Sequence, residues 1–129
     1  MNTKFFTSIV TIFSLAIELN ENTKEDVYSN TEEMLKSIID ENKLDISQII
    51  SIVFTATRDI DSAYPAVVAR KLGIVDASLM CVQEMYVENS LKMCIRAMVM
   101  VETDKKQNEM KNVYLNGATV LRPDLVNKR

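Results

Sequence analysis

The sequence predicts a single α+β domain, in which helices pack on one face of a mixed β-sheet. The chain has 129 residues, which suits one hydrophobic core and leaves little for a second domain. Its hydrophobic residues (47%) and charged residues (26%) are in globular proportion. The pattern of apolar residues predicts the order strand, helix, strand, helix, strand, strand, helix, strand. We therefore expect residues 1–129 to form one domain.

The first predicted element has two interpretations. Residues 5–16 are apolar and rich in Val, Ile, Thr and Phe, which is typical of a buried strand. They also follow Lys4 and end with small residues at Ser14 and Ala16, as a short signal peptide does. The stretch is too short and too polar to span a membrane. We favour the strand, and with it a cytoplasmic protein, because cleavage would remove a core element from a small domain.

A long helix is predicted next, from the N-cap Thr23 to about Glu41. A short turn at residues 45–48 follows it. The apolar residues at helical spacing, which predict the face that packs on the sheet, are Val27, Met34, Leu35, Ile38 and Ile39.

The middle of the chain continues this alternation. Residues 49–56 are apolar and β-branched and predict a buried strand, and residues 57–63 predict a polar loop. A helix is then expected over residues 64–72, with Pro65 in its first turn and Gly73 as its left-handed end.

The second half is predicted to hold mostly strands. Residues 78–87 and 90–101 read as strands, and residues 105–111 as one or two helical turns. Asn116-Gly117 predicts a tight turn into residues 118–121. Because helices cover only one face of such a sheet, we expect further copies of the chain to cover the other face.

Arg96 stands alone among apolar residues at positions 93–101. A guanidinium keeps its charge and is costly to bury unpaired. On a strand, Arg96 would share a face with Cys94, Met98 and Met100. Two interpretations remain open: a structural ion pair or snorkelling arginine, and an anion-binding site.

Glu84 is a second charge within an apolar segment, of opposite sign to Arg96. Strict alternation places Cys81 and Glu84 on opposite faces, so a bulge or a strand end must intervene if both line one site. The simpler alternatives are that Glu84 only pairs with Arg96 and that Cys81 only fills the core.

Composition excludes several classes of function. A net charge of -3 without a Lys/Arg cluster argues against a nucleic-acid interface. The chain has no histidine, so it has no histidine-based triad and no typical zinc site. Its two cysteines lie in apolar runs and indicate buried thiols in a reducing compartment. We expect no metal.

Four short segments resemble the monofunctional chorismate mutases of the AroH class. The similarity spans roughly residues 20–125 and includes Ala63-Tyr64-Pro65-Ala66 followed by Arg70. The four segments are Met80-Cys81-Val82-Gln83-Glu84-Met85, Lys92-Met93-Cys94-Ile95-Arg96-Ala97-Met98, Asn112-Val113-Tyr114-Leu115 and Val120-Leu121-Arg122-Pro123-Asp124-Leu125.

This resemblance implies a homotrimer whose sheets form a pseudo-barrel, with active sites between subunits. It implies the Claisen rearrangement of chorismate to prephenate, on the route to phenylalanine and tyrosine, without cofactor, metal or covalent intermediate. Arg96 would donate to the ether oxygen and a carboxylate, Glu84 would accept from the ring hydroxyl, and Tyr114 would donate to a carboxylate. The other implied substrate-binding residues are Met80, Cys81, Val82, Gln83, Leu121, Arg70 and Arg122, with Tyr64 and Ala66 from a neighbouring subunit.

The chain departs from the family pattern at its first strand. Ser14 stands where the family has an arginine that binds a carboxylate, and Leu15, where it has a glycine, could crowd the pocket. Val67 replaces a lysine. Each lost charge-assisted contact costs roughly 1.5 to 3 kcal/mol. These changes motivate an alternative, a catalytically impaired trimeric module that binds small carboxylates. A trimeric imine or enamine deaminase is a third hypothesis, which the motifs disfavour.

Overall fold

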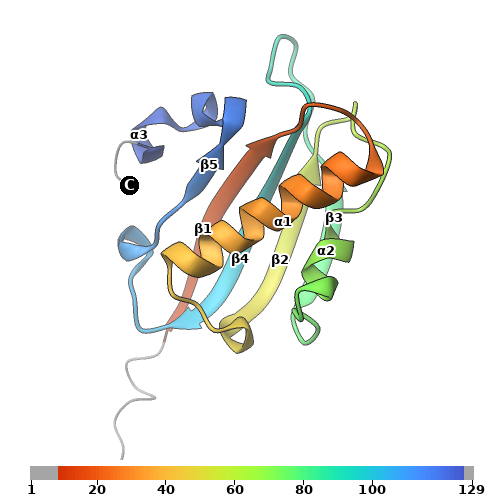
Figure 1. Cartoon of the computed structure of the whole chain (residues 1–129). Helices are drawn as coiled ribbons and strands as arrows, with labels where there is room; N and C mark the ends of the chain where they lie inside the picture. The colour runs from red at the N-terminus through yellow and green to blue at the C-terminus, as the bar shows by residue number, and fades with distance from the viewer. Residues whose placement is uncertain (1–8, 127–129) are drawn as a thin grey trace, which may run out of the picture.

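The structure is a computed structural model that describes residues 9–126. Its centre is a five-stranded mixed sheet of strand order β3-β2-β4-β1-β5 (Figure 1). β4 is antiparallel to both β1 and β2, whereas β1 pairs with β5 and β2 with β3 in parallel. The strands are β1 (Ile9–Glu18), β2 (Ile49–Ala56), β3 (Ser78–Gln83), β4 (Cys94–Thr103) and β5 (Val113–Leu115).

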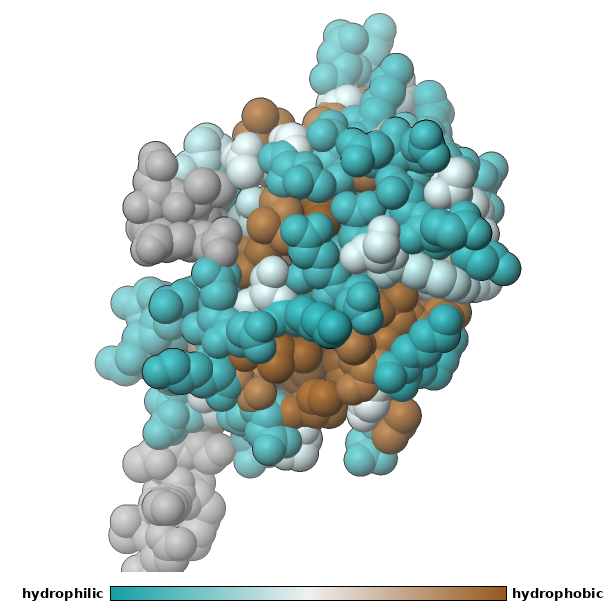
Figure 2. Space-filling model, viewed as in Figure 1, coloured by the Kyte–Doolittle hydropathy of each residue, from teal (hydrophilic) through white to brown (hydrophobic). Residues whose placement is uncertain are grey.

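Helices α1 (Lys24–Glu41) and α2 (Ala66–Lys71) lie on the same face of the sheet (Figure 1). This arrangement confirms the predicted fold class. The remaining helical segments are the short 3-10 turns η2 (Ile46–Gln48), η3 (Gln107–Glu109) and η4 (Asn116–Leu121), and helix α3 (Pro123–Val126). Seen from the helix side, hydrophilic residues cover most of the surface (Figure 2). Within residues 9–126, no helix is both long and apolar enough to cross a membrane.

Helix α1 forms where the sequence predicts it, for the expected reasons. The Thr23 hydroxyl oxygen accepts a hydrogen bond from the Asp26 amide at 3.1 Å and caps the helix. The buried residues on its inner face are Val27, Thr31, Met34, Leu35 and Ile38. Full burial of each large apolar side chain contributes about 1.5 to 3 kcal/mol, so this face anchors the helix to the sheet.

Strand β1 confirms the strand interpretation of the amino-terminal segment from Ile9 onward; residues 5–8 of that prediction lie outside the described residues. Phe13, Leu15 and Ile17 are buried in the core shared with α1. Leu15 therefore points to the helix side, and the expectation that it would crowd the pocket is wrong. Period-two alternation places Ser14 and Ala16 on the opposite, helix-free face.

Three predicted boundaries in the second half are wrong. β3 ends at Gln83 and β4 begins only at Cys94, so residues 84–93 form a loop. Asn89 and Met93 adopt positive φ angles of 65° and 55° in this loop, a backbone conformation incompatible with a strand. Residues 118–121 belong to η4, because the turn at Asn116 follows the last strand instead of preceding it.

Candidate active site

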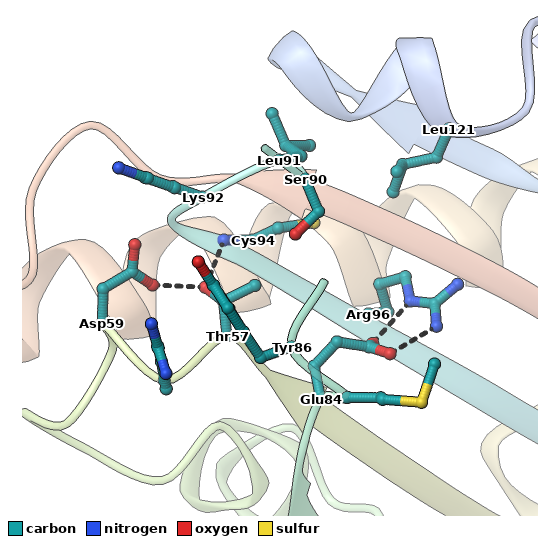
Figure 3. A pocket seen from close by; sticks show the side chains of 12 residues that line it. Thr57, Asp59, Glu84, Tyr86, Ser90, Leu91, Lys92, Cys94, Arg96 and Leu121 are labelled. Atoms are coloured by element: carbon teal, nitrogen blue, oxygen red, sulfur yellow. Dashed lines mark hydrogen bonds and ion pairs between the residues drawn. The ribbon is translucent and has the colours of Figure 1, made fainter. Parts of the chain in front are cut away.

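Arg96 and Glu84 form a bidentate ion pair on the helix-free face. The Arg96 Nε donates to Glu84 Oε1 at 2.7 Å and Nη2 donates to Oε2 at 2.8 Å (Figure 3). The pair is not buried inside the fold, since the side chains are 47% and 22% exposed. The structure therefore confirms an ion-pair partner for Arg96. Its partial exposure leaves the anion-binding interpretation as a prediction.

Alternation along β3 explains where Glu84 lies. Cys81 pairs with the fully buried Phe54 and packs against the core beneath the helices. Glu84 follows the end of the strand, and its amide donates to the Ala56 carbonyl at 2.9 Å. Cys81 and Glu84 thus face opposite sides of the sheet, and the side chain of Cys81 does not share the pocket of Glu84 in the same chain.

Hydrogen bonding fixes the ionisation state of the pair. The bonds from Arg96 lower the pKa of Glu84, and a hydrogen bond from the Thr55 hydroxyl lowers it further. The same carboxylate raises the pKa of Arg96. At neutral pH the site therefore offers a carboxylate that only accepts hydrogen bonds and a guanidinium that only donates them.

A cavity of about 380 Å³ opens in front of this pair (Figure 3). Its walls carry three cationic side chains, Arg58, Lys92 and Arg96, and two carboxylates, Asp59 and Glu84. The remaining lining residues are Thr57, Met85, Tyr86, Ser90, Leu91, Cys94 and Leu121. A cavity of this size and charge suits a small anion that also carries apolar surface.

Tyr114 belongs to the same face as Arg96. Ala16 on β1 lies opposite Arg96 on β4 and opposite Tyr114 on β5, so the three residues form one row across the sheet. Ala16 itself is fully buried, so this row is packed at its centre. Tyr114 is 4% exposed and packs in a second small cluster with Ala16, Cys94 and Ala118.

Cys94 supports this cluster and is not a nucleophile. Burial raises the pKa of its thiol to about 12. The thiol therefore stays neutral at physiological pH and acts as a small apolar side chain.

The loop after β2 holds the start of β4 and was not predicted to belong to the site. Both carboxylate oxygens of Asp59 accept from the Met93 amide, at 3.2 and 3.0 Å. The Thr57 hydroxyl donates to Asp59 and accepts from the Cys94 amide at 3.0 Å. These bonds hold the left-handed backbone conformation of Met93, the residue directly before β4 begins at Cys94.

Sequence reasoning also missed Thr55, Arg58, Tyr86 and Lys92. The Arg58 guanidinium lies over the Tyr86 ring, 3.6 Å from its centroid. For Arg58 one signal was available: it lies in a polar loop directly after a buried strand, and such loops commonly carry functional side chains.

The other predicted site residues lie apart from the cavity. Arg122 pairs with Asp124 at 3.0 Å and lines a second cavity of about 650 Å³, together with Ser14. Along β3, the edge strand of the sheet, Met80 is 59% exposed, and Val82 and Gln83 are also exposed. Around α2, Tyr64 and Arg70 are exposed whereas Ala66 packs in the core. Of the predicted residues, Glu84, Arg96 and Leu121 line the cavity of one chain. Tyr114 shares the sheet row of Arg96 but is not a lining residue, and the residues of β3 and α2 lie elsewhere.

Fold and site together define a small α+β protein with helices on one face of its sheet and a cavity lined by charged side chains on the other. The sequence matches the family model for chorismate mutase type I over residues 15–125. It is 37% identical over 111 residues to chorismate mutase AroH of Bacillus subtilis (strain 168), covering 85% of this chain and 87% of the relative. It is 35% identical over 111 residues to chorismate mutase AroH of Thermus thermophilus, covering 85% and 91%.

A solved chorismate mutase from Clostridium thermocellum matches with a TM-score of 0.82 and 42% sequence identity, covering 84% of this chain and 97% of that one. The chain belongs to the chorismate mutase type I family. The family match argues against the deaminase hypothesis, and none of these relatives supports the alternative of an impaired binding module.

Proposed function

We propose that the protein catalyses the Claisen rearrangement of chorismate to prephenate, which serves the biosynthesis of phenylalanine and tyrosine. The observation that carries this proposal is the bidentate pair of Arg96 and Glu84 at the wall of a cavity in a chain of this family. The rearrangement breaks a C–O bond as a C–C bond forms, within one molecule. It transfers no proton, so it needs neither an acid nor a base.

The opposite charges of Arg96 and Glu84 suit two polar groups of the substrate, the ether oxygen and the ring hydroxyl. The Arg96 guanidinium has three N–H donors left beyond the two bound to Glu84, and one of them stabilises negative charge that develops on the ether oxygen. Glu84, ionised and acceptor-only, receives the ring hydroxyl of the substrate. Tyr114, in the same row as Arg96, donates to a carboxylate. Enclosure of the folded substrate between these groups supplies orientation.

Turnover tests the proposal directly. Purified protein should consume chorismate faster than the uncatalysed reaction does, as measured by the loss of chorismate absorbance. Arg96→Ala should lower kcat/KM by about two orders of magnitude or more, as removal of a donor to a developing oxyanion does. Lys36→Ala, in an exposed helix pair remote from the cavity, is the matched control and should keep wild-type activity. A wild-type chain that does not exceed the uncatalysed rate refutes the activity.

We further propose that the complete site forms between copies in a homotrimer. This accounts for the separation of the predicted residues, because the β3 edge and Tyr64 of one copy can close the cavity of the next. Exposed apolar side chains on the helix-free face, among them Met80, Val82 and Met98, support burial of that face in an assembly. Arg70 and Arg122 would then flank the cavity mouth and attract the dianion.

Subunit mixing tests the shared site. Arg96→Ala removes a residue of one wall, and Val82→Asp disturbs the opposite wall. If the walls belong to different copies, refolding the two inactive variants together should restore part of the activity, and light scattering should report a trimer. No recovery from a mixed trimer contradicts a site shared between copies.

The cytoplasmic location stays a prediction. Cleavage after Ala16 would remove most of β1, including the buried Phe13 and Leu15. An intact mass that retains Met1 or Asn2 agrees with the cytoplasm, whereas an amino terminus at Ile17 indicates export.

A further inference from the structure

Ser14, at the position of the missing family arginine, makes a specific contact with a proposed substrate-binding residue. Its Oγ lies 2.8 Å from the hydroxyl oxygen of Tyr114, an ordinary hydrogen-bond distance between two hydroxyls. Alternation along β1 puts the Ser14 side chain on the same face as Ala16 and therefore on the face of Arg96. The contact thus belongs to the helix-free face, where the substrate is proposed to bind.

Asn112 holds Ser14 in place. The Ser14 amide donates to Asn112 Oδ1 at 2.9 Å, and the Ser14 Oγ lies 3.3 Å from the same oxygen. A backbone amide can only donate, so the atom of Asn112 that faces Ser14 is its carbonyl oxygen. The Ser14 hydroxyl therefore has two acceptors within reach, Asn112 Oδ1 and the Tyr114 oxygen.

These distances allow two arrangements of protons. In one, Tyr114 donates to Ser14, and Ser14 donates to Asn112 at the longer distance. In the other, Ser14 donates to Tyr114, which frees the phenolic hydrogen for a third acceptor. A carboxylate beside Tyr114 selects the second arrangement, because a hydrogen bond to an ion is about twice as strong as one between neutral groups. A hydrogen bond donated by Ser14 also polarises the Tyr114 hydroxyl, which strengthens the hydrogen bond that Tyr114 donates to the carboxylate.

We propose that Ser14 is a positioning residue that orients the Tyr114 hydroxyl to donate to a substrate carboxylate, in place of the absent arginine. The inference rests on the proposed function, since it assumes that chorismate binds beside Tyr114. Ser14 acts through Tyr114, and the pair forms a neutral carboxylate receptor. Tyr114 is almost fully buried, so its ring has little freedom to find another partner if the serine hydroxyl is lost.

A double-mutant cycle tests this role. Ser14→Ala should lower kcat/KM by about tenfold through a higher KM, with kcat little changed, because the carboxylate contact exists in both ground and transition states. The affinity for prephenate, measured by calorimetry, should fall by a similar factor. Tyr114→Phe should lower kcat/KM by at least the same factor. The double variant should have a kcat/KM no lower than that of Tyr114→Phe alone.

Two further variants separate positioning from a general structural effect. Ser14→Thr keeps the hydroxyl and has room for its methyl group at the second cavity, so it should stay within about threefold of wild type. Ser51 lies on β2, on the same face of the sheet as Ser14 but distant from Tyr114. Ser51→Ala should therefore leave kcat, KM and the affinity for prephenate unchanged. All variants should unfold at wild-type temperature within a few degrees.

Losses that multiply in the double variant, or a Ser14→Ala variant as active as wild type, would overturn the positioning role while leaving the mutase activity intact. A wild-type protein that neither converts chorismate nor binds prephenate would overturn both proposals.

Discussion

Thr55 donates a hydrogen bond of 2.6 Å to Glu84 Oε1, the same oxygen that accepts from Arg96 Nε. In the sheet, Thr55 lies opposite Arg96 on β4 and opposite Val82 on β3. Thr55 therefore lies beside both charged residues, and its hydroxyl helps to hold the carboxylate of Glu84, the first residue after β3. The cavity wall depends on this neutral residue as well as on the ion pair.

Removal of the Thr55 hydroxyl should weaken catalysis without unfolding the protein. Thr55→Val keeps the shape of the side chain, and loss of one hydrogen bond of about 1 kcal/mol should reduce kcat/KM roughly fivefold. Thr55→Ser retains the hydroxyl and serves as the control. Steady-state kinetics on chorismate measure the effect. A Thr55→Val variant with wild-type kinetics would show that Arg96 alone orients Glu84.

The pH dependence of stability should reveal the ionised Glu84. Its pKa is lowered in the folded protein, first by Arg96, so ionisation favours folding above the ordinary glutamate value of 4.5. This contribution should be lost as the pH falls through the lower folded-state pKa. The difference in free energy of unfolding between wild type and Glu84→Gln should therefore shrink below about pH 4.5. Urea titrations at several pH values measure it; a difference that grows toward low pH would contradict the sign of the shift.

The turn that starts β4 should depend on Asp59. Asp59→Ala leaves the Met93 amide and the Thr57 hydroxyl without their acceptor, and should lower the free energy of unfolding by about 1 to 3 kcal/mol. Asp59→Asn keeps one acceptor oxygen, so its free energy of unfolding should lie between those of Asp59→Ala and wild type. Urea denaturation provides the values, with Asp76→Ala in the exposed loop after α2 as the control. Equal stability of Asp59→Ala and wild type would mean that the turn at Met93 holds without this carboxylate.

Restoring the arginine on β1 should strengthen substrate binding. Ser14→Arg places a guanidinium on the face of Arg96 and Tyr114, where a charge-assisted bond of about 1.5 to 3 kcal/mol exceeds the neutral bond that is lost. We expect KM for chorismate to fall about threefold to tenfold. The measurement is a kinetic comparison at equal ionic strength, with a salt titration, because the gain should shrink as salt screens the charge. An unchanged KM would place residue 14 beyond reach of the substrate.

The order of most elements, the cap at Thr23 and the left-handed end at Gly73 follow from local rules, so sequence reasoning predicts them correctly. Alternation likewise predicts the two faces of β4 around Arg96, because the side-chain period of a strand is set by the backbone alone. The motifs identify the family, and the comparisons confirm it. These features require knowledge only of residues near one another in the chain.

Contacts between distant segments were decided by the tertiary structure. The partner of Ser14 is 100 positions away, the Met93 amide is bound by Asp59, and Thr55 on β2 meets Glu84 at the end of β3. Strand order brings these pairs together, and several orders are compatible with the same local pattern. The start of β4 was likewise unpredictable, since Met93 takes a left-handed conformation and its amide is bound by Asp59, 34 positions earlier in the chain. The sequence alone determined which groups the protein carries; packing of the sheet decided which of them act together.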